Sequence, residues 1–170
     1  MIEQDTIRLL RECDAGIKMG VSSIDDVLES TKDKNMHSLL SRCKAEHEKL
    51  KEEITAALDR FHDDGKNPNI MAKTMSAAKT NMELMIAPTD STIAGLMTDG
   101  RNMGVKSLSK YLNEYKAADE KAKDLCKRLI AIEEQLAKDL RGYLQHTPGC
   151  RPDPPEGFHP SDSLLRFALI

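Results

Sequence analysis

Apolar residues return every three or four positions along most of the chain, and this spacing predicts amphipathic helices. The first stripe predicts a helix over about residues 5–31, and its members are Ile7, Leu10, Ile17, Val21, Ile24 and Leu28. After a polar turn at 32–35, a second stripe predicts a helix over about 36–61, with Met36, Leu40, Cys43, His47, Leu50, Ile54, Leu58 and Phe61 turned inward. His47 alone interrupts the apolar seam of this second helix.

The second half of the chain shows the same spacing after a longer connection. Residues 69–86 predict an extra helix that is stopped by Pro88, with Met71, Met75, Met82 and Met85 on roughly one side. Residues 89–91 then offer an N-cap for a third bundle helix that ends near Lys116. A fourth helix is expected over about 118–145. The predicted order of connections is therefore short turn, long crossover, short turn.

Two segments of the first half recur in the second half. GIKMGVSSI at 16–24 corresponds to GRNMGVKSL at 100–108, and RCKAEHEKL at 42–50 corresponds to RLIAIEEQL at 128–136. Each copy holds two predicted helices, so the repeat predicts two helical hairpins that together form an all-α four-helix bundle. Antiparallel hairpins joined by a long crossover are typical of the ferritin-like arrangement.

The composition changes abruptly near residue 147. Five prolines follow within a short stretch, and the chain ends with the apolar sequence SLLRFALI. A proline-rich segment stays extended and cannot continue a bundle. We therefore expect a helical domain over 1–146 and a separate linker and apolar peptide over 147–170, with Leu164, Leu165 and Phe167 as its docking residues.

Composition and charge exclude several classes of function. The net charge is −3, tryptophan is absent and aromatic residues make up 4% of the chain, which argues against nucleic-acid binding. No apolar run is long enough for a membrane span, and the N-terminus lacks the pattern of a signal peptide. The four cysteines show no CxxC pairing, so we expect Cys13, Cys43 and Cys126 to be small buried residues in a reducing cytoplasm.

The repeated GxxMG and AEHEKL/AIEEQL segments resemble the ferritin-like superfamily over residues 5–146. The chain is most similar to the small bacterial branches of unassigned function and least similar to cage ferritins. Di-iron members of that superfamily take carboxylates from all four helices, because two iron ions bring several positive charges into a dry core. In the matching register this chain presents Ile17, His47, Arg101 and Glu133, with Lys44 and Ile130 where two further ligands would stand.

This layer departs from the di-iron pattern, because Arg101 keeps its positive charge and opposes a metal ion at close range. The residues favour a closed polar cluster in which Arg101 pairs with Glu133 and His47 lies nearby. A single weakly held iron or manganese ion on His47 and Glu133 is the alternative. The methionine stripe over 71–85 suits Cu(I) as well as core packing, and packing is favoured because no Cys or His lies beside it.

The sequence thus predicts a non-enzymatic cytoplasmic bundle that acts as a homo-oligomer or as a module for a protein partner, with no catalytic residue and no cofactor. No Ser-His-Asp set, phosphate loop or dinucleotide turn is present. The alternative is a metal-handling or oxidoreductase protein with a reduced metal site. Its C-terminal peptide is loosely similar to those that place ferritin-like cargo inside bacterial encapsulin shells. That peptide could equally fold back on the bundle, bind a second subunit, or originate from an expression vector.

Overall fold

The computed structural model describes residues 2–65 and 89–144 of the chain. Within these residues the protein is all-helical, with four long helices packed together and no strand. They are α1 (Ile2–Leu28), α2 (Lys34–Asp59), α4 (Asp90–Glu114) and α5 (Glu120–Leu140), and a 3₁₀ turn (Arg141–Tyr143) follows α5. The expected extra helix over 69–86 and the expected linker and peptide over 147–170 lie outside the described residues.

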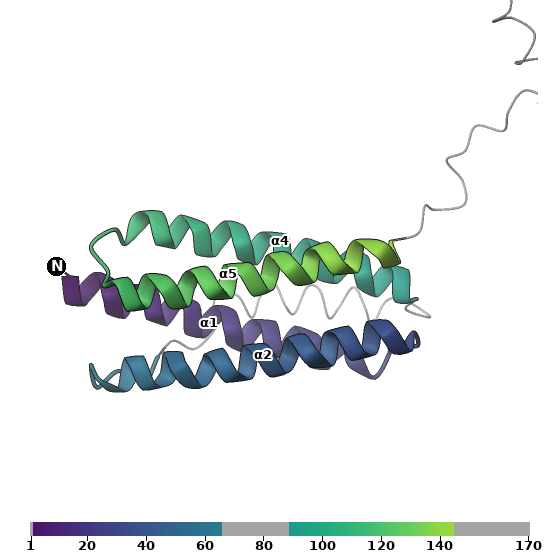
Figure 1. The fold of residues 1–170 in the computed structure, drawn as a ribbon, viewed down its shortest axis with the longest axis horizontal. Helices are drawn as coiled ribbons and strands as arrows, with labels where there is room; N and C mark the ends of the chain where they lie inside the picture. The colour runs from purple at the N-terminus through teal and green to yellow at the C-terminus, as the bar shows by residue number, and fades with distance from the viewer. Residues whose placement is uncertain (1, 66–88, 145–170) are drawn as a thin grey trace, which may run out of the picture.

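The four helices form two antiparallel hairpins that lie side by side (Figure 1). The helices α1 and α2 form one hairpin, and α4 and α5 form the other. The helices α2 and α4 run in the same direction, because α4 begins at the end of the bundle where α2 also begins. Contacts between the hairpins join α1 to α4 and α2 to α5, and α1 also meets α5 across the centre.

Asp90, the first residue of α4, fastens the second hairpin to the turn of the first. Its carboxylate accepts hydrogen bonds from the backbone N–H groups of Lys32 (2.8 Å) and Asp33 (3.0 Å). Asp33 in turn is the N-cap of α2 and accepts from the N–H groups of Asn35 and Met36. These two carboxylates satisfy backbone donors that a turn and a helix start would otherwise leave unpaired.

At the opposite end of the bundle, Asp119 is the N-cap of α5. Its side chain accepts from the N–H of Ala122 (2.7 Å), and its own N–H donates to the hydroxyl of Thr6 on α1 (2.9 Å). Replacing Asp119 with alanine is expected to lower the free energy of unfolding by about 1 kcal/mol, since one helix N-terminus loses its cap. Urea denaturation measures this loss. The Asp119→Ser variant, which keeps a capping oxygen, should remain close to the parent, and an equal loss in both variants would contradict the explanation.

The core consists of two apolar clusters, one toward each end of the bundle. Cluster 1 contains Leu9, Leu10, Cys13, Ile17, Leu50, Ile54, Leu125 and Leu129 among others. Cluster 2 contains Ile24, Met36, Leu40, Cys43, Ile93, Leu136 and Leu140 among others. On each of α1, α2 and α5 the nearest members of the two clusters are about two helical turns apart. The buried residues midway between them are Gly20, His47 and Glu133.

The inward stripe predicted for α2 is confirmed from Met36 to Leu58, where every member is buried. The stripe predicted for α1 is confirmed at Leu10, Ile17 and Ile24, which are buried, but it does not describe the whole buried face. Leu9, Cys13 and Val27 are buried, whereas the predicted members Ile7, Val21 and Leu28 are only half-buried. The reason is that α1 contacts α2, α4 and α5, so its buried face is wider than one stripe.

The helix ends also differ from the predictions. The first helix begins at Ile2 and ends at Leu28, and the fourth ends at Leu140 rather than near residue 145. After Leu28 the N–H groups of Ser30 and Thr31 bond three residues back, which tightens the chain into a turn. After Leu140 the chain tightens in a similar way, in a short 3₁₀ turn that contains Gly142. None of the described helices combines the length and the apolar character that crossing a bilayer requires.

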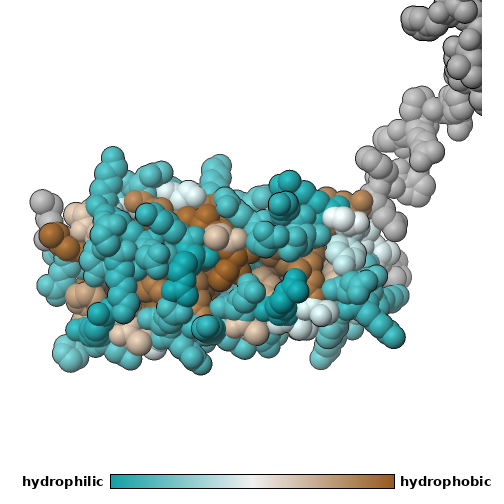
Figure 2. All heavy atoms as spheres, viewed as in Figure 1, coloured by the Kyte–Doolittle hydropathy of each residue, from teal (hydrophilic) through white to brown (hydrophobic). Residues whose placement is uncertain are grey.

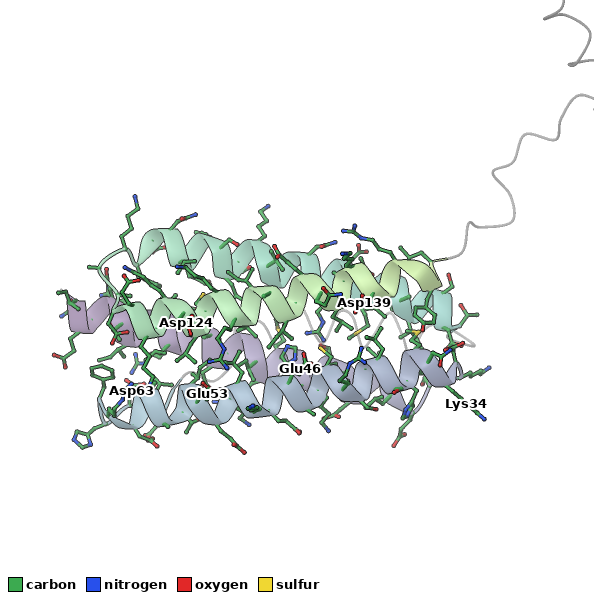
Figure 3. The ribbon with its side chains drawn as sticks, viewed as in Figure 1. Lys34, Glu46, Glu53, Asp63, Asp124 and Asp139 are labelled. Atoms are coloured by element: carbon green, nitrogen blue, oxygen red, sulfur yellow. The ribbon has the colours of Figure 1, made fainter. Side chains whose placement is uncertain are left out.

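Polar and charged side chains cover most of the face of the bundle that Figure 2 shows, and apolar residues gather in a band along its middle. One ion pair on the surface joins the two hairpins. Glu53 of α2, labelled in Figure 3, accepts two hydrogen bonds of 2.7 Å from the guanidinium of Arg128 on α5. Pairs this exposed stabilise a fold only slightly. The apolar core and the polar layer inside it are therefore the features that matter most for stability.

Candidate functional site

Three ionisable side chains meet in the layer between the two apolar clusters. His47 of α2, Arg101 of α4 and Glu133 of α5 are 0%, 4% and 4% exposed. His47 and Glu133 each lie one turn away from buried apolar residues on both sides, and Arg101 lies one turn after the buried Met97, so the periodicity that buries the core also buries these polar groups. Burial of ionisable groups lowers stability unless the groups are paired. The contacts of these three side chains therefore determine whether the layer stabilises the fold.

His47 donates hydrogen bonds through both ring nitrogens. Nε2 lies 2.9 Å from Oε1 of Glu133, and Nδ1 lies 2.9 Å from the backbone oxygen of Cys43. Because both partners are acceptors, both nitrogens carry a proton and the ring is an imidazolium. Burial by itself lowers the pKa of His47, but the contact with the Cys43 side chain, whose Sγ lies 3.5 Å from Nδ1, and the interactions with the Glu133 carboxylate outweigh it and raise the pKa from 6.5 to about 10.

Arg101 links the second hairpin to α1. Its Nη1 donates to both carboxylate oxygens of Glu133, at 3.0 and 2.9 Å. Its Nη2 donates to the backbone oxygen of Gly20 and to the hydroxyl of Ser23, both at 3.1 Å. One guanidinium therefore joins α4 to α5 and to α1, and the His47–Glu133 bond adds α2 to the same network.

Glu133 is ionised despite its burial. Burial raises the pKa of Glu133, but the neighbouring charges of Arg101 and His47 outweigh that effect and lower it below its ordinary value. The three residues thus carry two positive charges and one negative charge. The carbonyl oxygens of Gly20 and Cys43 accept two further hydrogen bonds from the charged donors, so the excess positive charge meets two backbone dipoles.

Gly20 provides the space that this network needs on α1. A Cβ atom at Gly20 would lie 2.9 Å from Nη1 of Arg101 and 3.0 Å from Nε2 of His47, which is closer than such atoms approach. At Gly104, its counterpart in the sequence repeat, a Cβ atom would meet Glu133 Cδ only at an ordinary 4.0 Å. The two glycines therefore share a position in the repeat but have different packing roles.

The structure brings together His47, Arg101 and Glu133, three of the four residues that the sequence places in one layer. The fourth, Ile17, is fully buried in cluster 1 instead, and Gly20, one turn further along α1, lies against Arg101 and His47. Lys44, which stands where the di-iron pattern has a glutamate, turns to the surface and pairs with Asp25 at 2.6 Å. Ser23 and the carbonyl oxygens of Gly20 and Cys43 were missed by the sequence analysis. The only signal for Ser23 is its position three residues after Gly20, one turn along the same face of α1.

Comparisons of the chain with protein-family models, with curated proteins and with solved structures found no match. Within residues 2–65 and 89–144, no group of three or more His, Cys, Asp or Glu side chains is arranged to hold a metal ion. A metal at His47 and Glu133 would first have to displace a ring proton and two hydrogen bonds, because histidine binds metals through a deprotonated nitrogen.

The described cysteines lie in the apolar core. Cys13, Cys43 and Cys126 are buried free thiols, as predicted, and Cys150 lies outside the described residues. The thiols of Cys13 on α1 and Cys126 on α5 share a hydrogen bond, which together with burial raises the pKa of Cys13 well above its ordinary value. A thiol held in this state is a weak nucleophile, so Cys13 acts as a packing residue between two helices. The same hydrogen bond lowers the pKa of the Cys126 thiol, which is also buried in the core.

Proposed function

We propose that this protein is a non-enzymatic helical bundle of the ferritin-like type in which a closed polar layer replaces the metal centre. The observation that carries this proposal is the position of the Arg101 guanidinium. It lies against the carboxylate of Glu133 and reaches across to the backbone of Gly20. In a bundle of this type that central space would hold the metal ions. The chain acts through its surfaces, as a dimer or as a module for a protein partner in the cytoplasm.

The ferritin-like assignment is supported by the order and direction of the helices. Two antiparallel hairpins lie side by side, and α2 and α4 run in the same direction. Parallel α2 and α4 require the intervening residues to return along the length of the bundle, which is the long crossover of ferritin-like folds. In an up-down-up-down four-helix bundle, whose connections are all short, these two helices would run in opposite directions.

The charge of the layer supports a structural role over metal handling. The layer already carries one more positive than negative charge, so a divalent ion there would face two cations and a single carboxylate. Coulomb repulsion between charges a few Å apart is large in a buried site. The same charges serve a structural purpose, because the bonds made by Arg101 and the bond between His47 and Glu133 each join two different helices.

Metal analysis of untagged protein from iron- and manganese-supplemented cells tests the metal-free state. We expect each metal at far less than one ion per chain, with no change when His47 is replaced by glutamine. Stoichiometric iron or manganese that disappears in the His47→Gln variant would overturn the proposal in favour of a metal-handling protein. Sedimentation velocity of the same preparation tests whether the chain acts as a dimer or binds a protein partner. A monomer that co-purifies with no other protein would contradict this part of the proposal.

A further inference from the structure

The face of the bundle between α1 and α4 is hollowed into a groove of about 110 Å³. Four glycines, Gly16 and Gly20 on α1 and Gly100 and Gly104 on α4, leave its lining without side chains at those positions. Its walls are largely apolar and include Met19, Val27, Leu96 and Met97. The groove follows the two helices over several turns, so its shape suits another helix lying along them.

The middle of the groove is open. A Cβ atom at Gly100 would meet nothing within 4 Å, and one at Gly16 would only make ordinary contacts of 3.7 Å with Leu108 and Leu129. The groove lies directly over the polar layer, because Arg101 and Glu133 contribute to its floor. An occupant of the groove would therefore shield the buried charges from water, and this would strengthen the hydrogen bonds between them.

The last described residues after α2 lie against α1. The guanidinium of Arg11 holds Asp63 through hydrogen bonds of 2.8 and 2.6 Å. Gly65 follows with φ +80°, and a Cβ atom there would collide with the carboxylate of Asp14. The described part of the first hairpin thus ends with its backbone against the N-terminal half of α1.

The chain resumes at the other end of the bundle. Thr89 caps α4, and Asp90 bonds to the α1–α2 turn at Lys32. In Figure 3, Asp63 and Lys34 are labelled at opposite ends of the bundle. Residues 66–88 must therefore run back along the whole molecule to connect Gly65 with Thr89.

The length of this connection matches the groove. Along α1, the distance from Asp14 to Leu28 corresponds to roughly 21 Å at the rise of an α-helix, and a helix over 69–86 would span roughly 27 Å. Its sequence places Met71, Met75, Ala78, Met82 and Met85 at alternating steps of four and three residues. That spacing makes one narrow apolar seam. Unbranched methionine side chains suit an uneven surface floored by glycines.

We propose that residues 66–88 occupy the α1/α4 groove as a further helix of the bundle, with the methionine seam against Gly16, Gly20, Gly100 and Gly104. The charges of the segment and of the groove border are complementary. The segment carries Lys66, Lys73 and Lys79 against one glutamate, and the groove is bordered by Glu12 and Asp26. The groove is then part of the interior and not an open binding site for a small molecule.

Limited trypsin digestion of the full chain tests the proposal, with cleavage after Lys73 and Lys79 followed by mass spectrometry. Gly100→Trp fills the groove, and Gly142→Trp is a matched control because its Cβ also meets nothing within 4 Å but it does not line the groove. We expect Gly100→Trp to speed cleavage at these lysines at least tenfold and to lower Tm, and Gly142→Trp to change neither.

Equal cleavage rates in Gly100→Trp and the parent would overturn the proposal. So would cleavage of the parent at Lys73 and Lys79 as fast as that of the isolated 66–88 peptide, an outcome that assigns the groove to a second copy or another partner. If Gly100→Trp fails to fold, the double substitution Met75→Glu and Met82→Glu replaces it. This variant should retain the helical circular dichroism of the bundle and show the same fast cleavage, and unchanged protection would again contradict the placement.

Discussion

The substitution Glu133→Gln is expected to lower the free energy of unfolding by about 3–5 kcal/mol, which is among the largest losses that a single change can cause in this fold. The reason is that Glu133 is the one carboxylate bonded to both Arg101 and His47. Its removal leaves two buried cations facing each other while the shape of the side chain is kept. Urea denaturation at pH 6 measures the loss.

The neighbouring Glu134 provides the control. It lies on the same helix but is exposed, so Glu134→Gln should stay within about 0.5 kcal/mol of the parent. A similarly small loss for Glu133→Gln would mean that the layer contributes no more than an ordinary surface charge, and the structural role proposed for it would be wrong.

The same network predicts how stability depends on pH. The pKa of His47 is raised from 6.5 to about 10 on folding, so its contribution is fully present below pH 6.5 and is lost as the pH rises toward 10. The pKa of Glu133 is lowered on folding, so its contribution is present above the ordinary glutamate pKa of 4.5 and is lost as the pH falls below it. The layer therefore stabilises the fold most between pH 4.5 and pH 6.5. In the His47→Gln variant, the free energy of unfolding should fall less steeply than in the parent as the pH rises from 6.5 toward 10.

The substitution Gly20→Ala is expected to destabilise the protein by about 1–3 kcal/mol, although alanine is the better helix former. The added methyl group would lie 2.9 Å from Nη1 of Arg101, which its hydrogen bonds to Glu133 and the backbone hold in place. Either the guanidinium moves and loses bonds, or α1 moves away from α2 and α4. Thermal unfolding followed by circular dichroism at 222 nm measures the effect.

Gly104→Ala is the matched control, because it adds the same methyl group at the corresponding position of the repeat. Here the nearest atom is at 4.0 Å, so we expect a gain of up to about 1 kcal/mol from helix propensity. Opposite signs for the two variants support the packing role of Gly20. Equal signs would show that helix propensity alone decides both positions.

The sequence predicted the parts of this fold that depend on periodicity. The stripe of α2 and the inward position of His47 follow from the three- and four-residue spacing, which the structure confirms. The register of the repeat also placed Arg101 and Glu133 in one layer with His47. It did so because equivalent helices of two hairpins occupy equivalent heights in a bundle.

Other features depend on tertiary contacts that no local pattern contains. The buried face of α1 is wider than its predicted stripe because three helices surround it, and a single-helix pattern shows only one direction of burial. The acceptors for the excess positive charge are backbone carbonyls of Gly20 and Cys43, and every residue has such a group. Their role can be recognised only when the helices are placed together.

The unequal charges of the polar layer decide which hairpins can pair. The two halves of the chain are similar enough that two copies of the first hairpin could in principle form a bundle by themselves. Such a bundle would bring two His47 rings together with no carboxylate between them, whereas the first and second hairpins together combine His47 with Arg101 and Glu133. The charges therefore favour pairing of the first hairpin with the second over pairing of the first hairpin with a copy of itself. This preference holds equally when the two halves come from different molecules, so a dimer formed by exchange of hairpins would keep the layer intact.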